Sequence, residues 1–139
     1  MFEHRRLGIG RDAVAPDGSD VRLLLELRGG GMAHFSLAPG AVSVPVHHRT
    51  VEEIWYVVAG RGEMWRKDED REELLPLESG TCLTVPLGTH FQFRTVGAEP
   101  LEVVAVTMPR WPGDGEAVRS MQRKWPPTVR SGPGLGQPS

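Results

Sequence analysis

Imidazole and carboxylate side chains gather in two segments of the sequence, and both groups can bind metal ions or transfer protons. His47 and His48 shortly precede Glu53, and His90 lies further along the chain. An imidazole and a carboxylate are common ligands of divalent metals, and together they also serve as an acid–base pair. The alternative is a buried pair that only satisfies its own hydrogen bonds. The residue types by themselves leave both interpretations open.

Other kinds of chemistry have no support in the residue pattern. Cys82 is the only cysteine, so no intrachain disulfide can form, and this usage suits a reducing cytoplasm. Gly29–Gly31 is not followed by Lys and Ser or Thr, so it predicts a flexible turn rather than a phosphate-binding loop. The formal net charge of −2 predicts no basic surface for nucleic acid, and no apolar run is long enough to span a membrane. We therefore expect a cytoplasmic protein that binds a small molecule rather than nucleic acid or a membrane.

Short stretches rich in β-branched and aromatic residues alternate with turn residues along most of the chain. The clearest stretch is Glu53–Ala59, which reads Glu-Ile-Trp-Tyr-Val-Val-Ala. The pattern predicts about nine strands, over residues 21–27, 32–37, 42–48, 53–59, 63–67, 72–77, 81–85, 90–94 and 101–108. Such a series of short strands is typical of an all-β antiparallel sandwich or barrel.

The length of 139 residues fits one domain between two less regular ends. We expect residues 1–20 to form an irregular lead-in and residues 21–108 to form the barrel. Residues 109–139 then form a C-terminal tail, within which residues 117–124 are the best candidate for a short helix. The last ten residues are rich in Gly, Pro and Ser and are expected to lack fixed structure.

Two segments resemble the two sequence motifs of the cupin family. The first runs from Gly40 to Gly60, and within it His48 and Glu53 stand at the positions of a motif histidine and the motif glutamate. The second runs over residues 80–93, where glycine and proline recur at the motif positions. The two segments lie at the expected separation within a strand-rich chain, so the resemblance is specific for the fold.

The resemblance implies a double-stranded β-helix, or jelly-roll barrel, over residues 21–108. In this family the motif histidines and glutamate point into the barrel and hold a divalent transition metal, such as Fe, Mn, Zn or Ni. Members include dioxygenases, isomerases, decarboxylases and modules that bind sugars or effectors. The resemblance therefore implies an architecture and a site inside the barrel, rather than one reaction.

The metal set that the resemblance implies is incomplete in this sequence. Val46 stands at the first histidine position, and Phe91 stands at the histidine position of the second motif, with His90 one residue early. Because successive strand side chains point to opposite faces, strict register leaves only His48 and Glu53 inside the barrel. A β-bulge in the second motif would instead turn His90 inward and complete a metal set of His48, Glu53 and His90.

These positions also predict a pocket for a small molecule. The expected ligand-binding residues are His48, Glu53, Trp55, Trp65, His90, Phe91 and Gln92. One hypothesis is a metal-dependent enzyme of the oxygenase or isomerase class, in which His48 is a metal ligand or general base. Glu53 would then be a second ligand or would orient His48 through a hydrogen bond. The other hypothesis is a metal-free, non-enzymatic module that binds or senses a ligand without any cofactor.

The resemblance also implies a homodimer, because cupins often pair through their strand edges, which covers exposed edge strands. Two tryptophans of the tail, Trp111 and Trp125, are candidate anchors of the tail on the barrel or on a partner subunit.

Overall fold

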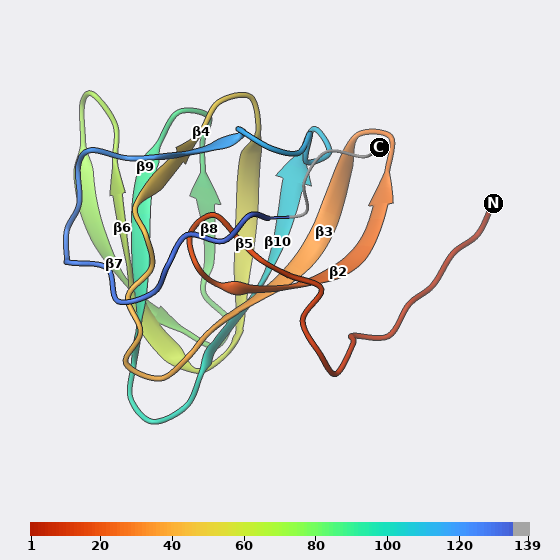
Figure 1. Ribbon diagram of the computed structural model, residues 1–139, viewed down its shortest axis with the longest axis horizontal. Helices are drawn as coiled ribbons and strands as arrows, with labels where there is room; N and C mark the ends of the chain where they lie inside the picture. The colour runs from red at the N-terminus through yellow and green to blue at the C-terminus, as the bar shows by residue number, and fades with distance from the viewer. Residues whose placement is uncertain (135–139) are drawn as a thin grey trace.

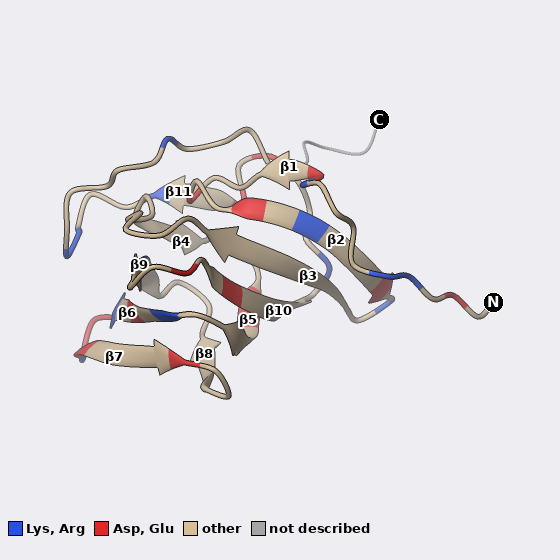
Figure 2. Cartoon of the chain, turned by 90° about the horizontal axis from the view of Figure 1, so that it is seen from below, with Lys and Arg blue, Asp and Glu red and all other residues tan. Residues whose placement is uncertain are grey.

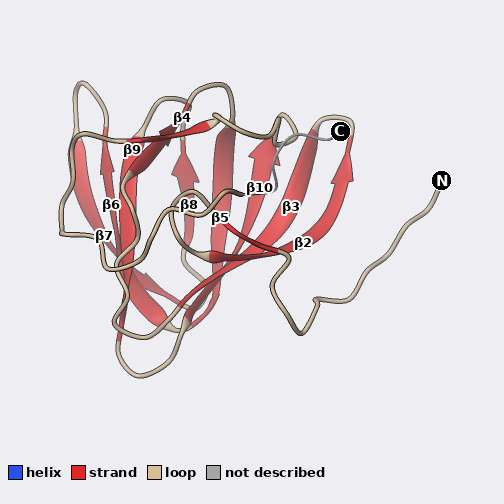
Figure 3. Ribbon diagram, in the orientation of Figure 1, coloured by secondary structure: helices blue, strands red, loops and turns tan. Residues whose placement is uncertain are grey.

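The computed structural model describes residues 1–134, and the regular elements among these residues are all strands (Figure 3). None of the described residues belongs to a helix that is long and apolar enough to cross a membrane. The strands of the described chain are β1 (Ala13–Val14), β2 (Asp20–Leu27), β3 (Gly30–Leu37), β4 (Val46–His48), β5 (Glu52–Ala59), β6 (Arg61–Lys67), β7 (Glu72–Glu78), β8 (Cys82–Val85), β9 (His90–Val96), β10 (Leu101–Met108) and β11 (Ala117–Arg119). The strands that the sequence predicts correspond to β2 through β10, and β1 and β11 are additional.

Two antiparallel sheets form the barrel and enclose a shared core (Figure 1). The larger sheet has the order β1-β2-β3-β10-β5-β8, and the smaller sheet has the order β11-β4-β9-β6-β7. Strands that are distant in the sequence pair side by side, as β3 does with β10 and β4 with β9. This arrangement confirms the predicted all-β jelly-roll barrel.

Alternation of side chains along the strands builds the core between the sheets. On β5, Trp55 and Val57 are buried, whereas Ile54 and Tyr56 are exposed. The main core cluster consists of Leu37, Ala41, Val44, Val46, Trp55, Val57, Met64, Leu77, Leu83, Val85, Phe91, Phe93, Leu101, Val103 and Ala105. Burial of each large side chain of this kind stabilises the fold by about 1.5–3 kcal/mol relative to exposure. The period-two pattern in the sequence therefore determines which side chains face the interior.

Charged residues lie mainly on loops and on the outer positions of the strands. Figure 2 shows Lys and Arg interspersed with Asp and Glu along the chain. On β2, for example, Arg22 lies between Asp20 and Glu26.

The lead-in contributes one strand and one tight turn to the barrel. The short strand β1 pairs with β2, and the chain reverses between them at Gly18, whose φ is +90°. A Cβ at Gly18 would lie 2.3 Å from Cγ2 of Val129, so only glycine fits both the conformation and the packing there. The turn that precedes β2 is thus packed directly against the C-terminal tail.

The C-terminal tail folds back along the outside of the barrel. Residues 117–119 form β11, which pairs with residues 46–48 of β4 at the edge of the smaller sheet. The prediction of a short helix over residues 117–124 is therefore wrong, because the backbone groups at its start complete a sheet edge instead. Figure 1 shows the following segment, in blue, running across β9 and β6.

The tail continues to the lead-in, where it makes further backbone hydrogen bonds. The N–H groups of Gly132 and Gly134 donate to the carbonyls of Ala15 and Val14, at 2.8 Å each. These contacts hold residues 130–134 in place, although the sequence predicted no fixed structure for them. The remaining part of that prediction, residues 135–139, lies outside the described residues.

Gln92 is the buried residue that fastens the tail to β9. Its Nε2 donates to the carbonyl oxygens of Ser43 and Trp125, at 2.8 Å each, and its Oε1 accepts from the N–H groups of Lys124 and Trp125. Its side chain is 0% exposed, and its hydrogen bond to Ser43 is buried, while those to Lys124 and Trp125 are partly buried. The amide at this position therefore joins the tail to the barrel through side-chain hydrogen bonds.

We predict that Gln92→Ala destabilises the protein by about 3 kcal/mol, because it leaves several buried backbone groups without partners. Unfolding in urea, followed by tryptophan fluorescence, measures the loss. Gln122→Ala, which changes an exposed glutamine of the same tail, is the matched control and should change stability by less than about 0.5 kcal/mol. Equal effects of the two substitutions would show that the tail is not fastened through Gln92.

Candidate functional site

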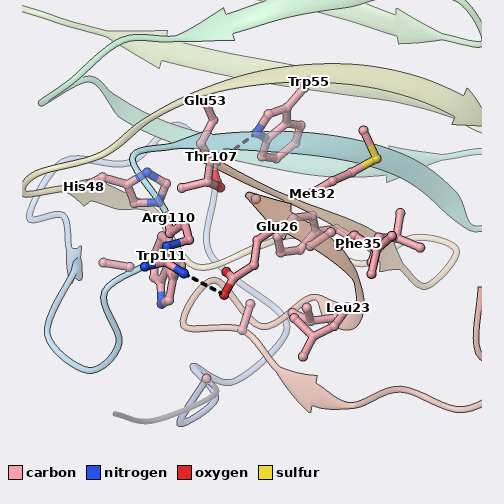
Figure 4. Close-up of a pocket in the computed structure, with 18 of the residues that line it drawn as sticks. Leu23, Glu26, Met32, Phe35, His48, Glu53, Trp55, Thr107, Arg110 and Trp111 are labelled. Atoms are coloured by element: carbon pink, nitrogen blue, oxygen red, sulfur yellow. Dashed lines mark hydrogen bonds and ion pairs between the residues drawn. The ribbon is translucent and has the colours of Figure 1, made fainter. Parts of the chain in front are cut away.

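A cavity of about 700 Å³ opens into the barrel beside β2, β3 and β5 (Figure 4). Its apolar wall includes Phe35, Val46, Trp55 and Trp111. Its polar groups are Asp17, His48, Glu53 and Thr107, and charged residues such as Glu26 and Arg110 lie where it meets solvent. Two of the predicted site residues, His48 and Glu53, therefore do face one enclosed space, together with Trp55.

The carboxylate of Glu53 is held by two neighbouring side chains of the larger sheet. Nε1 of Trp55 donates to Oε1 at 3.0 Å, and Oγ1 of Thr107 donates to Oε2 at 2.6 Å. Thr107 lies on β10 directly opposite Glu53 on β5, which explains the second contact. Glu53 is 4% exposed. Both of its oxygens therefore already have a hydrogen-bond donor from the barrel wall.

His48 lies at the end of β4, between two aromatic rings. Phe91 and Trp111 contact the imidazole edge to face, with ring centroids 5.3 Å and 5.1 Å away. His48 is 6% exposed, and its buried Nδ1 has no hydrogen-bond partner among the described residues. The hydrogen bonds of Glu53 go to Trp55 and Thr107 rather than to His48, so the structure differs from the hypothesis that Glu53 orients the imidazole.

Asp17 is a buried acid of the cavity that the sequence analysis did not select. It lies in the turn between β1 and β2, and its carbonyl oxygen accepts from the N–H of Val44 at 2.8 Å. The N–H and Oγ of Ser19 both donate to Oδ1, at 2.9 and 2.6 Å. Burial raises the pKa of the Asp17 carboxyl above its ordinary value of 3.8, while these hydrogen bonds and the nearby Glu53 and His48 act as smaller influences.

The strand of the second motif keeps strict register, and this determines whether the predicted metal ligands can come together. Val46 pairs with Phe91, and both side chains lie in the core, where the family motifs carry histidines. His90 consequently points to the outer face and does not line the cavity with His48 and Glu53. The predicted set of three therefore requires correction: no bulge turns His90 inward. Among residues 1–134, no group of three or more His, Cys, Asp or Glu residues is arranged to hold a metal ion.

On the outer face, His90 belongs to a small polar cluster beneath the tail. Its Nδ1 lies 2.6 Å from Oγ of Ser120, and its ring centroid lies 4.7 Å from that of His47. Burial lowers the pKa of His90 below its ordinary value of 6.5. Repulsion from the positive charges that His47 and Lys67 can carry lowers it further.

Three other predicted binding residues also lie away from the cavity surface. Trp65 and Gln92 pair across β6 and β9 on the outer face, where Nε1 of Trp65 donates to Glu72 at 2.7 Å. Phe91 faces inward but lies behind His48 and Trp55 in the core, rather than on the cavity wall. In each case the residue serves the packing of the barrel.

A second buried acid, Glu116, fixes the loop that joins His48 to Glu53. Its carboxylate accepts from the N–H groups of Thr50 and Val51, at 2.7 and 3.1 Å, and from Oγ1 of Thr50. Burial alone would raise the pKa of Glu116, but these hydrogen bonds outweigh it and the pKa is lowered. The tail thus positions the loop between the two motif residues.

The chain belongs to the cupin family, since residues 33–107 match the family model described as Cupin domain. No curated protein matches the sequence. Among solved structures, an uncharacterized conserved protein with a double-stranded β-helix domain from Klebsiella pneumoniae is 18% identical, with a TM-score of 0.61, and the match covers 88% of this chain and 97% of that one.

Two larger proteins share the fold over part of their length. A variant of oxalate decarboxylase from Bacillus subtilis is 18% identical with a TM-score of 0.65, and the match covers 78% of this chain and 30% of that one. CapF from Staphylococcus aureus is 14% identical with a TM-score of 0.63, and the coverage is 77% and 33%. The chain thus spans about a third of the length of these two proteins. At these identities the likeness shows a shared fold.

The residues of this barrel do not fit the metal that the family resemblance implies. Val46 and Phe91 place hydrocarbon where two imidazoles would bind, and Glu53 is engaged by Trp55 and Thr107. Of the described histidines with an unpartnered nitrogen, only His48 lines the cavity, and one or two protein ligands hold a transition metal weakly.

We predict that Asp17→Asn makes stability less dependent on pH. Because burial raises the pKa of Asp17, the folded protein binds a proton more tightly than the unfolded chain does. The wild type should therefore lose stability relative to the variant as the pH rises from 3.8 through the raised pKa. Urea unfolding at a series of pH values measures this difference, with exposed Asp114→Asn as the control. Parallel curves for wild type and Asp17→Asn would contradict the prediction.

Proposed function

We propose that this cupin binds a small organic molecule inside the barrel and does so without a resident metal ion. The observation that carries the proposal is His48, a buried imidazole with an unpartnered nitrogen on the wall of a largely apolar cavity of about 700 Å³. Small-molecule sites are commonly built in this way, from hydrophobic and aromatic walls with a few polar groups that fix orientation.

The aromatic wall supports a ligand with a flat or apolar body. The rings of Phe35 and Trp55 stack, with centroids 6.2 Å apart and planes inclined by 8°. Trp111 lies across the cavity entrance beside His48, as Figure 4 shows. Apolar surface buried against these rings would supply most of the binding free energy, at about 25 cal/mol per Å² before the cost of association.

The same side chains favour the metal-free hypothesis over a metal-dependent oxygenase or isomerase. A metal site of the family type needs ligands from both motifs. In the second motif of this chain, however, the side chain that points into the interior is Phe91. The remaining motif acid, Glu53, ties β5 to β10 through its hydrogen bonds. Apart from His48, the donors that the family uses for catalysis are thus replaced or engaged, while the cavity itself is retained.

Ligand binding can be tested with a cavity-filling variant. We predict that compounds from a small-molecule library raise the Tm of the wild type and change the fluorescence of Trp55 and Trp111. At a concentration of 100 times Kd, stabilisation should reach about 2.7 kcal/mol. Ala33→Phe, which fills the cavity from β3, should abolish both responses, whereas Ala98→Phe in an exposed turn should retain them. Equal responses of the two variants would place binding outside the barrel.

Metal binding can be tested by restoring the motif residues. We predict that wild type incubated with Mn²⁺, Fe²⁺, Zn²⁺ or Ni²⁺ and desalted retains less than one equivalent by elemental analysis. The double substitution Val46→His and Phe91→His should increase the retained metal, because it adds two imidazoles beside His48. Stoichiometric metal in the wild type that disappears in both His48→Ala and Glu53→Ala would refute the metal-free proposal.

We further propose that the protein is a homodimer that pairs through the outer face of β5. Ile54, Tyr56 and Val58 are exposed there, at 42%, 51% and 45%, next to the edge strand β8. Trp111 packs against His48 and Trp125 against Arg94 of the same chain, which supports the alternative that these tryptophans anchor the tail on the barrel.

Light scattering tests the dimer. The wild type should have the mass of two chains at micromolar concentration, and Tyr56→Glu should shift it toward one chain by placing a charge in the apolar row. Met121→Glu, at an exposed position of the tail, should have no effect. A wild-type monomer would contradict the proposal.

A further inference from the structure

We propose that the cavity selects ligands that carry a positively charged nitrogen, with Asp17 as the counter-ion. This inference rests on the proposed binding function and names the class of ligand that the same cavity takes. It depends on the charges around the cavity, on an unpartnered carboxyl oxygen of Asp17, and on the surrounding rings.

Two buried carboxyl groups line the cavity, and no buried lysine or arginine lies among the described lining residues to balance them. Asp17 and Glu53 are 7% and 4% exposed. Of the described residues that line the cavity, only Arg5 and Arg110 are lysine or arginine, and both are exposed, while His48 is a buried imidazole. A ligand cation beside the two carboxyl groups would favour their ionised forms against the cost of burial, and an anion would not.

Both arginines already have partners at the mouth of the cavity. Nη1 of Arg110 lies 3.5 Å from Oε1 of Glu26, an ion pair drawn in Figure 4. Nη1 of Arg5 donates to the carbonyl oxygen of Leu24 at 3.3 Å. Neither guanidinium group pairs with Asp17 in the structure, which leaves that carboxyl group open to a positive charge from a ligand.

Asp17 presents an acceptor that no described side chain uses. Both hydrogen bonds from Ser19 end on Oδ1 of Asp17, so Oδ2 receives no donor from the described residues. Nδ1 of His48 also lacks a hydrogen-bond partner among the described residues, but this atom is itself buried. Glu53, in contrast, has a donor on each oxygen. An ammonium group carries several N–H donors, which suits the unpartnered oxygen of the Asp17 carboxylate.

Aromatic rings near these acceptors favour the same class of ligand. Phe35, Trp55 and Trp111 line the cavity, and the faces of aromatic rings attract cations. The same rings can cover an apolar ligand body. The expected ligand is therefore an amine whose charged end reaches Asp17 and whose body lies against the rings.

The carboxylate of Asp17 is fixed before any ligand arrives. Its backbone is held by Val44, and its side chain is held by Ser19. The adjacent Gly18 is packed against Val129 of the tail, which leaves the turn little room to move. A fixed acceptor binds more tightly than a mobile one, because little conformational freedom is lost on binding.

The experiment compares ligands that differ only in their head group. Phenylethyl and hexyl compounds that end in an ammonium, a hydroxyl or a carboxylate group are titrated into the full-length protein, and binding is measured by calorimetry and by tryptophan fluorescence. We expect the ammonium compounds to bind about tenfold or more tightly than the alcohols, and the carboxylates to bind weakest.

Asp17→Asn supplies the decisive variant, because asparagine keeps the size of the side chain and an oxygen for Ser19. It should weaken binding of the ammonium compounds by about tenfold or more and change binding of the alcohols by less than about twofold. Asp114→Asn, which makes the same change at an exposed acid of the tail outside the cavity lining, is the matched control and should affect both head groups little. Unfolding curves for each variant establish that it is folded.

The outcomes separate this inference from the proposed function. If the alcohols or carboxylates bind as tightly as the ammonium compounds, or if Asp17→Asn weakens all three head groups equally, the inference is overturned while binding in the cavity stands. A second outcome is that none of these compounds binds, but the library yields neutral or anionic ligands whose binding is abolished by Ala33→Phe. In that case the inference is overturned and the proposed function stands. If no compound of either set binds, the proposed function fails as well.

Discussion

The hydrogen bonds that converge on Glu53 are the interaction on which the site depends. Trp55 and Thr107 donate to its two oxygens, and they lie on β5 and on the neighbouring strand β10. A buried carboxylate without donors would be strongly destabilising, so these contacts make an acid tolerable inside the core. They also turn the indole of Trp55 edge-on toward Phe91 and leave its face to the stacked Phe35. One acid thus fixes both the strand pair and the aromatic wall of the cavity.

The alternation of side chains along β4 and β9 explains why the two faces of the smaller sheet have different roles. Val46 and Phe91 occupy the inner face, which removes imidazoles from the interior and makes the cavity more apolar. His90 and Gln92 occupy the outer face, where the tail folds over them. The tail then reaches the loop after β4 through Glu116 and the turn of Asp17 through Val129. The tail therefore helps to position the turn of Asp17 and the loop after His48 from outside the barrel.

Much of the fold could be predicted from the sequence, because alternation of side chains is a local signal. Glu53–Ala59 reads as a half-buried strand and is one, and Phe91 faces inward as strict register requires. The sequence left open whether His90 points into or out of the barrel, because a β-bulge leaves no reliable mark in a sequence. Asp17 was missed because Pro16-Asp17-Gly18 has the composition of an exposed turn. The adjacent Gly18 packs against Val129 of the tail, more than a hundred residues later in the chain, and such a contact has no local signature.

The most direct test of the account is the indole N–H resonance of Trp55 in the ¹H–¹⁵N spectrum, recorded before and after one equivalent of Mn²⁺ is added. If Glu53 is held by the barrel wall and no ion binds beside it, this N–H exchanges slowly with solvent and its signal keeps its intensity after Mn²⁺ is added. A rapidly exchanging N–H whose signal is selectively broadened by Mn²⁺ would show that Glu53 is available to a metal, and the account of a metal-free cavity would be contradicted.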